Sequence, residues 1–135
     1  MHFYLVKIIK YLSERNLVIL AVVFTIGITI ASLASLNNVP KIEVPGKDKT
    51  IHFLFYFVLT LLWNFALQKK NKHWSLKFII VFVVVIYGII IEILQEVLTR
   101  YREADIFDVM ANSAGAFLAL IVIFWLNYKT FEKKL

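Results

Sequence analysis

Polar side chains whose types could support chemistry lie at the ends of three long apolar segments of this chain. They are Asp48, Lys49, His52 and Tyr56 at the start of one segment, Glu92, Gln95 and Glu96 at the end of the next, and Arg102, Asp105, Asp108 and Asn112 around the start of the last. An ionisable residue inside a membrane is costly and by default suggests a functional site. If the segments cross a membrane in alternating directions, all three groups meet on one side of it.

Catalysis is one interpretation of this polar site. His52 beside a carboxylate could act as a general base, with Glu92 as a general acid. However, the sequence contains no HExxH or GxSxG motif, no cysteine and no Gly-rich phosphate loop, which are short motifs that would indicate a hydrolase or a nucleotide site. Whether the chain is an enzyme stays open on these residues, and we favour a non-catalytic protein.

A divalent metal is a related interpretation, with His52, Glu92, Glu96 and Asp108 as a ligand set made mostly of hard oxygen atoms. No second histidine lies near His52 in the sequence. A single histidine in a membrane helix is more often a hydrogen-bonding residue than a ligand. We therefore expect neither a metal nor another cofactor.

A binding pocket is the third interpretation. The mixture of Arg, Asp, Glu, Asn and Tyr side chains would suit a lipid head group, a cell-wall precursor or a glycopeptide. Lys49 and Arg102 would contact a phosphate or a carboxylate, which arginine can hold through two hydrogen bonds. Asn112 and Gln95 would add neutral hydrogen bonds.

A polar network that only holds the helices together is the fourth interpretation, since charges inside a membrane must be paired, protonated or hydrated. The basic residues Lys49, Arg100 and Arg102 lie near enough in the sequence to pair with the acids Glu96, Asp105 and Asp108. A transporter ranks last, because four helices leave little room for a pathway in a monomer and no inverted repeat is visible.

Four apolar segments must position these residues, in a chain of 135 residues that is 61% hydrophobic and 18% charged. They are residues 16–36, 50–67, 76–98 and 106–128, and each is close to the ~20 residues that a helix needs to cross a bilayer. Their hydrophobicity is continuous, whereas the strands of a membrane barrel alternate. The sequence therefore predicts an all-α, polytopic membrane protein with one domain, residues 1–135, and four transmembrane helices.

Helical spacing gathers the polar residues on single faces. In the second helix the face is His52, Tyr56, Thr60 and Asn64; in the third it is Gly88, Glu92, Gln95, Glu96 and Thr99; in the fourth it is Asp105, Asp108, Asn112, Gly115 and Ala119. The small residues Gly88, Ala111, Gly115 and Ala119 would allow close helix packing. Thr25, Thr29 and Ser32 predict hydrogen bonds between helices, and Asp48 is expected to cap the second helix.

Basic residues predict the orientation. Ten of the fifteen Lys and Arg lie before the first helix, between the second and third, or after the fourth, namely Lys7, Lys10, Arg15, Lys69, Lys70, Lys72, Lys77, Lys129, Lys133 and Lys134. The positive-inside rule then predicts that both termini are cytoplasmic and that the polar site faces outward. The net charge of +6 reflects this topology, and no nucleic-acid motif accompanies it.

The first helix could also be read as a signal peptide, because Ser32-Leu33-Ala34 offers small residues for cleavage. Its apolar segment is longer than the roughly 7–15 residues of a signal sequence. We therefore expect it to be retained. The sequence does not indicate an oligomeric state.

Three motifs in order resemble those of VanZ-like membrane proteins. They are Asp48-Lys49-x-x-His52-Phe53-x-x-Tyr56, then Glu92-x-x-Gln95, then Arg102-x-x-Asp105-x-x-Asp108-x-x-x-Asn112-x-x-Gly115. The resemblance covers residues 48–119, and it departs from the pattern at Ala119, where many members have a second glycine. The founding member is associated with teicoplanin resistance.

The resemblance implies a bacterial inner-membrane protein that acts at the cell envelope. Its expected partners are the lipid bilayer and an envelope lipid, a peptidoglycan precursor or a glycopeptide, with teicoplanin tolerance as one consequence and no nucleic acid. The alternative is a membrane-embedded envelope enzyme that uses a His/carboxylate or metal site.

Overall fold

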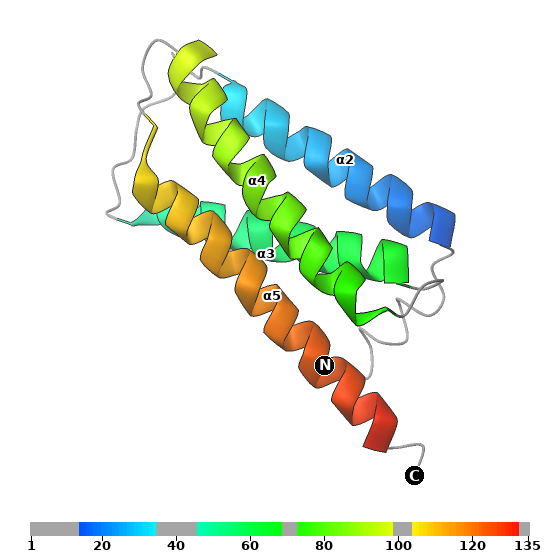
Figure 1. The fold of residues 1–135 in the computed structure, drawn as a ribbon. Coiled ribbons are helices and arrows are strands. Elements are labelled where there is room, and N and C mark those ends of the chain that lie inside the picture. Colours follow the sequence, from blue (N-terminus) through cyan, green and yellow to red (C-terminus); the bar gives the residue numbers. More distant parts are fainter. Residues whose placement is uncertain (1–13, 35–45, 69–72, 99–103, 133–135) are drawn as a thin grey trace.

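The computed structural model describes residues 14–34, 46–68, 73–98 and 104–132, and these form four α-helices (Figure 1). The helices are α2 (Glu14–Leu33), α3 (Lys47–Gln68), α4 (Trp74–Leu98) and α5 (Ile106–Glu132). All four are long and apolar enough to cross a membrane. This confirms the predicted all-α membrane architecture.

The four helices alternate in direction. Lys49 in the first turn of α3 pairs with Asp105 and Asp108 at the start of α5, and Gln95 near the end of α4 donates a hydrogen bond to the Ser32 carbonyl near the end of α2. These four helix ends therefore lie together, on the left of the view in Figure 1. We call this end of the bundle the polar end.

Like α4, helix α3 contacts each of the other three helices. Its most extensive contact is with α5, where Gly115 lies against the α3 backbone. A Cβ atom at Gly115 would collide with the Phe53 carbonyl oxygen and would lie 3.0 Å from the Phe57 nitrogen. Two further small residues of α5, Ala116 and Ala119, are completely buried. The close approach of α3 and α5 thus depends on small residues of α5.

Helix α2 is attached to α3 and α4 by hydrogen bonds as well as by apolar packing. The Trp63 indole N–H donates to the Thr25 hydroxyl at 3.1 Å, and the Tyr87 hydroxyl donates to the Thr25 carbonyl at 3.1 Å. The Thr29 and Tyr87 hydroxyls lie 2.9 Å apart. The prediction that Thr25 and Thr29 form hydrogen bonds between helices is confirmed.

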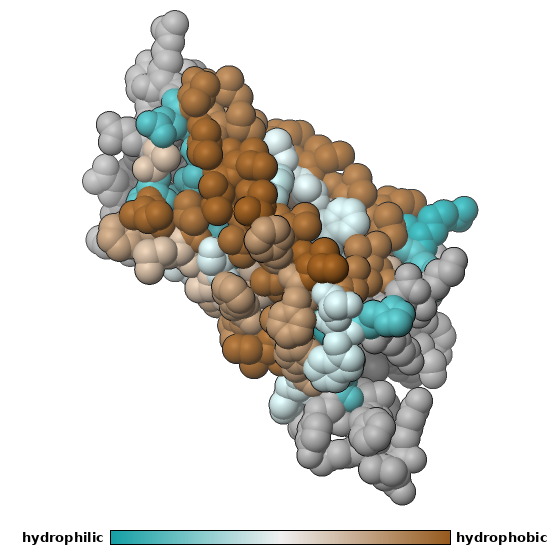
Figure 2. All heavy atoms as spheres, in the orientation of Figure 1, coloured by the Kyte–Doolittle hydropathy of each residue, from teal (hydrophilic) through white to brown (hydrophobic). Residues whose placement is uncertain are grey.

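The outer surface of the bundle is mainly apolar. Figure 2 shows hydrophobic side chains over most of the visible face and hydrophilic side chains mainly toward its ends. Large exposed side chains such as Val23, Phe82 and Ile121 would be unfavourable in water and suit contact with lipid. This surface agrees with a multi-pass membrane protein.

A buried lysine lies at the opposite end of α4 from the polar end. Lys77 is 4% exposed, and its ammonium lies 4.7 Å from the centre of the Trp74 ring and 5.2 Å from that of Phe124. Such cation–π contacts partly replace the water that burial removes. Lys77 thereby joins the start of α4 to the far half of α5.

Candidate functional site

The start of α3 brings Asp48, Lys49 and His52 to the polar end. Gly46 adopts a left-handed φ of 79°, a conformation that glycine reaches without steric cost, and its carbonyl accepts the Thr50 N–H at 3.1 Å. The helix therefore begins at Lys47. The expectation that Asp48 caps this helix is wrong, because Asp48 lies inside the first turn.

Asp105 caps α5 and at the same time joins it to α3. One of its carboxylate oxygens accepts the Phe107 N–H at 2.8 Å, and its backbone carbonyl accepts the Asp108 N–H at 2.9 Å. Its other carboxylate oxygen lies 2.5 Å from the Lys49 ammonium. That ammonium also donates to Asp108 Oδ1 at 2.9 Å. Lys49 is thus held between two carboxylates of α5.

Acid is expected to destabilise the protein through Asp105, which precedes the apolar span that begins at Ile106. The hydrogen bond from Lys49 and then the one from the Phe107 N–H hold the pKa of Asp105 below its ordinary value. A carboxylate with a lowered folded pKa adds stability above its unfolded pKa of about 3.9, and this stability is lost as the pH falls through the folded pKa.

Thermal unfolding in detergent from about pH 6 down to about pH 2.5 measures this effect. Asp105→Asn retains an oxygen for the Phe107 N–H but removes the charge. The variant is therefore expected to be less stable than the wild type at neutral pH and to lose less stability in acid. An identical acid response in both proteins would contradict the assignment.

His52 lies where α3, α4 and α5 meet and is 7% exposed. Its Nδ1 atom lies 3.1 Å from Asn112 Oδ1 and 3.5 Å from Glu92 Oε1. Its Nε2 atom points to the other side and lies 3.8 Å from both Asp48 Oδ1 and Asp108 Oδ2. The imidazole is therefore in contact with oxygen atoms from four side chains.

Tyr56, Glu92 and Asn112 form the buried inner part of the site, and each is at most 2% exposed. Gly88 makes room for them, since a Cβ atom there would lie 2.9 Å from Tyr56 Cε1 and 3.3 Å from Asn112 Nδ2. Within the described residues, the Tyr56 hydroxyl and the Asn112 amide nitrogen have no hydrogen-bond partner. Burying such a group unsatisfied costs roughly 1–3 kcal/mol.

The structure brings together eight of the eleven predicted site residues. We call them the polar cluster: Asp48, Lys49, His52, Tyr56, Glu92, Asp105, Asp108 and Asn112. Within the described residues it combines four carboxyl groups with one lysine, so it is rich in acid. Lys49, which the sequence offered as a contact for an anionic ligand, already holds two carboxylates.

Of the three other predicted residues, two have a different position in the structure and one is not described. Gln95 is buried but donates to the Ser32 carbonyl of α2 at 2.9 Å. Glu96 is exposed, because at about 100° per residue it lies about 80° around α4 from Gly88; its assignment to the buried face was wrong. Arg102, with Arg100 and Thr99, lies outside the described residues. Of the predicted packing residues, Gly88, Gly115 and Ala119 are buried and Ala111 is half-buried.

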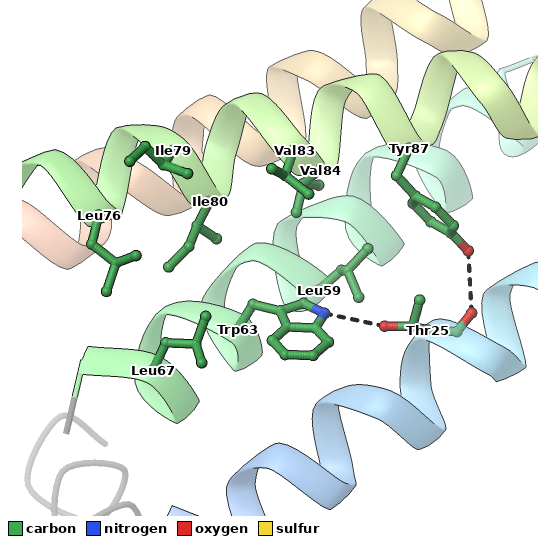
Figure 3. A pocket seen from close by; sticks show the side chains of 10 residues that line it. All are labelled: Thr25, Leu59, Trp63, Leu67, Leu76, Ile79, Ile80, Val83, Val84 and Tyr87. Atoms are coloured by element: carbon green, nitrogen blue, oxygen red, sulfur yellow. Dashed lines mark hydrogen bonds between the residues drawn. The ribbon is translucent and has the colours of Figure 1, made fainter. Parts of the chain in front are cut away.

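An apolar pocket of about 330 Å³ runs from Tyr87, next to the polar cluster, toward Leu67 and Leu76 at the opposite end of the bundle. Figure 3 shows side chains of α3 and α4 around it, with Thr25 of α2 on one side. Tyr87 lines the pocket and packs against Tyr56 of the polar cluster, with ring centres 5.9 Å apart. Sequence reasoning missed Tyr87 and Trp63, although aromatic side chains with a polar tip inside an apolar segment are a usable signal.

These features define a class: an integral membrane protein whose described residues form four long apolar helices, with a partly buried cluster of acids, a histidine and a lysine at one end of the bundle. The chain belongs to the VanZ/LLP1 family, whose family model matches residues 5–127. The resemblance inferred from the three motifs is thereby confirmed.

A relative and the solved structures complete the comparison. An uncharacterized protein of the fission yeast Schizosaccharomyces pombe is 35% identical over 102 residues, which cover 74% of this chain and 60% of the relative. The chain thus spans less than two thirds of that protein's length. No solved structure matches the chain.

Proposed function

We propose that this protein binds a lipid of the cell envelope, with the polar head group at the polar cluster and one acyl chain in the apolar pocket. The observation that carries the proposal is a pair of buried donors, the Tyr56 hydroxyl and the Asn112 amide, that have no hydrogen-bond partner in the part of the chain that the structure describes. Tyr56 also packs on Tyr87, which lines the apolar pocket. Because an unpaired buried donor is costly, a ligand with acceptor oxygens would recover part of that cost.

The polar cluster selects for the chemistry of the head group. Its carboxyl groups would accept hydrogen bonds from hydroxyl or ammonium groups, and Tyr56 and Asn112 would donate to ester or phosphate oxygens. Lys49 is engaged by Asp105 and Asp108, so it adds little to the binding of a free anion. A head group that presents both donors and acceptors fits better than a simple phosphate.

The pocket suits an acyl chain in composition and in length. Its walls include Leu59, Ile80 and Val84, which offer no hydrogen bonds. Along α4 it extends from Leu76 to Tyr87, a span of about 16 Å at the rise of an α-helix. Since Tyr87 packs on Tyr56, the head group would lie at the Tyr87 end of the bound tail.

The setting that fits this ligand is a membrane whose lipids reach the polar end. A relative in a fission yeast favours a membrane lipid over a bacterial cell-wall intermediate, because membrane lipids occur in both kinds of cell. In a bacterium the inner membrane would hold the protein, and a glycopeptide with a lipid tail, such as teicoplanin, would use the same head-and-tail site.

Tyr56→Phe is expected to weaken lipid binding about tenfold, the effect of one lost hydrogen bond of about 1.4 kcal/mol. The fold should keep its stability, since the hydroxyl has no partner within the described residues. Native mass spectrometry of the detergent-purified protein, with added lipids of different head groups, measures retention. A variant that loses stability but retains lipid like the wild type would contradict the proposal.

The tail site has its own test. Val83 lines the pocket from the lipid-facing side and is exposed, so Val83→Trp should fill the pocket and reduce lipid retention. Phe82→Trp is the matched control, because Phe82 is exposed on the same helix and does not line the pocket. Equal retention by both variants would remove the pocket from the proposal.

The predicted orientation, with both termini cytoplasmic and the polar cluster outside, is tested by labelling. The chain has no cysteine, and Lys47 and His73 are exposed at opposite ends of the bundle. Lys47→Cys should react with a membrane-impermeant thiol reagent added to intact cells, and His73→Cys should react only after lysis. The opposite pattern would place the polar cluster in the cytoplasm.

An enzyme that acts on the same head group is the second candidate. The contact of His52 with oxygen atoms of Asp48, Glu92, Asp108 and Asn112 favours it, since a histidine oriented by such groups can act as a general base. Radiolabelled lipid should then be converted by the wild type and not by His52→Gln. Binding without conversion would support the first candidate.

A further inference from the structure

We infer that Asp48, His52 and Asp108 bind a divalent cation at the polar end. One ligand atom from each lies within 4.8 Å of the other two. This inference goes beyond the proposed lipid binding and does not depend on it. It also differs from the sequence-based expectation, which favoured no metal and placed Glu92 and Glu96 in the alternative ligand set.

The distances around His52 carry the first part of the argument. Its Nε2 atom lies 3.8 Å from Asp48 Oδ1 and 3.8 Å from Asp108 Oδ2. Both contacts are too long for hydrogen bonds, which end near 3.2 Å for N–H···O. Two ligands of one ion lie about 2.0–2.6 Å from it, so they can be about 4–5 Å apart. The spacing therefore suits a cation between the three side chains.

The surroundings of the other His52 nitrogen, Nδ1, also support a cation at Nε2. Nδ1 faces Asn112 Oδ1 at 3.1 Å and Glu92 Oε1 at 3.5 Å, so a neutral imidazole is best protonated at Nδ1. The Nε2 lone pair then points toward two carboxylates, which would repel it. A cation removes this conflict. Metal-binding histidines commonly donate their second N–H to an amide or carboxyl oxygen, which fixes the ring.

Asp108 is also oriented so that one of its carboxylate oxygens can bind the cation. Lys49 donates to Asp108 Oδ1 at 2.9 Å, and this leaves Oδ2 directed toward His52. Asp48 and Asp108 together supply two negative charges, which match a divalent ion. The Asp48 side chain is 53% exposed, so an ion can reach the site from the polar end. One nitrogen and two carboxylate oxygens suit Mn²⁺ or Zn²⁺ better than Mg²⁺ or Ca²⁺.

To test this, the 135-residue protein is stripped of metal with a chelator, purified in detergent without added lipid and titrated with Mn²⁺. Electron paramagnetic resonance measures how much Mn²⁺ binds. One bound Mn²⁺ per chain is expected, with a magnetic coupling to nitrogen that His52→Gln removes. Asp48→Asn should weaken binding at least tenfold. It should leave the fold intact, because Asp48 is largely exposed.

Glu96→Gln is the matched control, since Glu96 is an exposed carboxylate at the same end of the bundle and does not belong to the proposed ligands. It should bind Mn²⁺ like the wild type. The inference is overturned if the wild type binds no Mn²⁺, if Asp48→Asn and Glu96→Gln weaken binding equally, or if the nitrogen coupling is absent. Because no lipid is added, none of these results depends on whether the protein binds one.

Discussion

Gly115→Ala is expected to lower the free energy of unfolding by about 3 kcal/mol, at the upper end of the usual cost of overpacking a core. The added Cβ atom would collide with the Phe53 carbonyl oxygen and lie 3.0 Å from the Phe57 nitrogen. Both atoms belong to the α3 backbone, which cannot rotate away as a side chain can. The two helices with the most extensive contact would have to separate.

Thermal unfolding in detergent, followed by helical circular dichroism, measures this loss. Gly27→Ala is the matched control, because it makes the same change in α2, where a Cβ atom would have nothing within 4 Å. It should be neutral or stabilise the protein by up to about 1 kcal/mol, since alanine favours a helix over glycine. If both variants had the same melting temperature, close packing at Gly115 would not support the fold.

Lys49→Met is expected to cost about 2 kcal/mol. The change removes the partner of Asp108, whose side chain is only 7% exposed, and an unpaired buried charge typically costs about 3–5 kcal/mol. The side chain of Lys49 is 39% exposed, so water reduces the loss. Lys47→Met is the matched control because Lys47 is exposed two residues earlier, and it should change stability little.

A double-mutant cycle separates the Lys49–Asp108 interaction from other effects of the Lys49 change. Lys49→Met combined with Asp108→Asn should lose less than the sum of the two single variants, since the second change removes the charge that the first leaves unpaired. Chemical unfolding of all four proteins gives the coupling energy. Strict additivity would mean that the two side chains do not stabilise each other.

The four helices were predictable from the sequence because each apolar segment is continuous over about a membrane thickness. Their ends were less predictable. The positive φ of Gly46 starts α3 at Lys47, three residues before the apolar segment. Helix α2 ends at Leu33, before the expected end at residue 36. Apolar composition indicates how many residues of a segment can lie in lipid, whereas local backbone geometry determines where the helix begins and ends.

The polar face of α3 was predictable because a spacing of four residues fixes a helical stripe. His52, Tyr56, Thr60 and Asn64 are all buried, as that spacing indicated. The contacts that the polar residues of α4 make were not predictable, because the rotation of a helix against its neighbours depends on packing. A small rotation decides that Gln95 meets α2 while Glu92 meets His52. The cap formed by Asp105 could have been anticipated, since aspartate before a helix is a common cap.

The buried lysine at the far end of α4 has a consequence for where polar groups lie relative to the lipid. Lys77 and Glu92 are both buried, and they are fifteen positions apart, about 22 Å along the helix. A typical hydrocarbon core is about 30 Å thick. The outer face of the same helix carries large exposed apolar side chains from Trp74 to Leu98, about 36 Å, so the protein fits a bilayer of ordinary thickness. Polar groups inside the bundle therefore lie nearer the midplane than the surrounding head groups, and a head group that contacts Glu92 would have to leave its own layer.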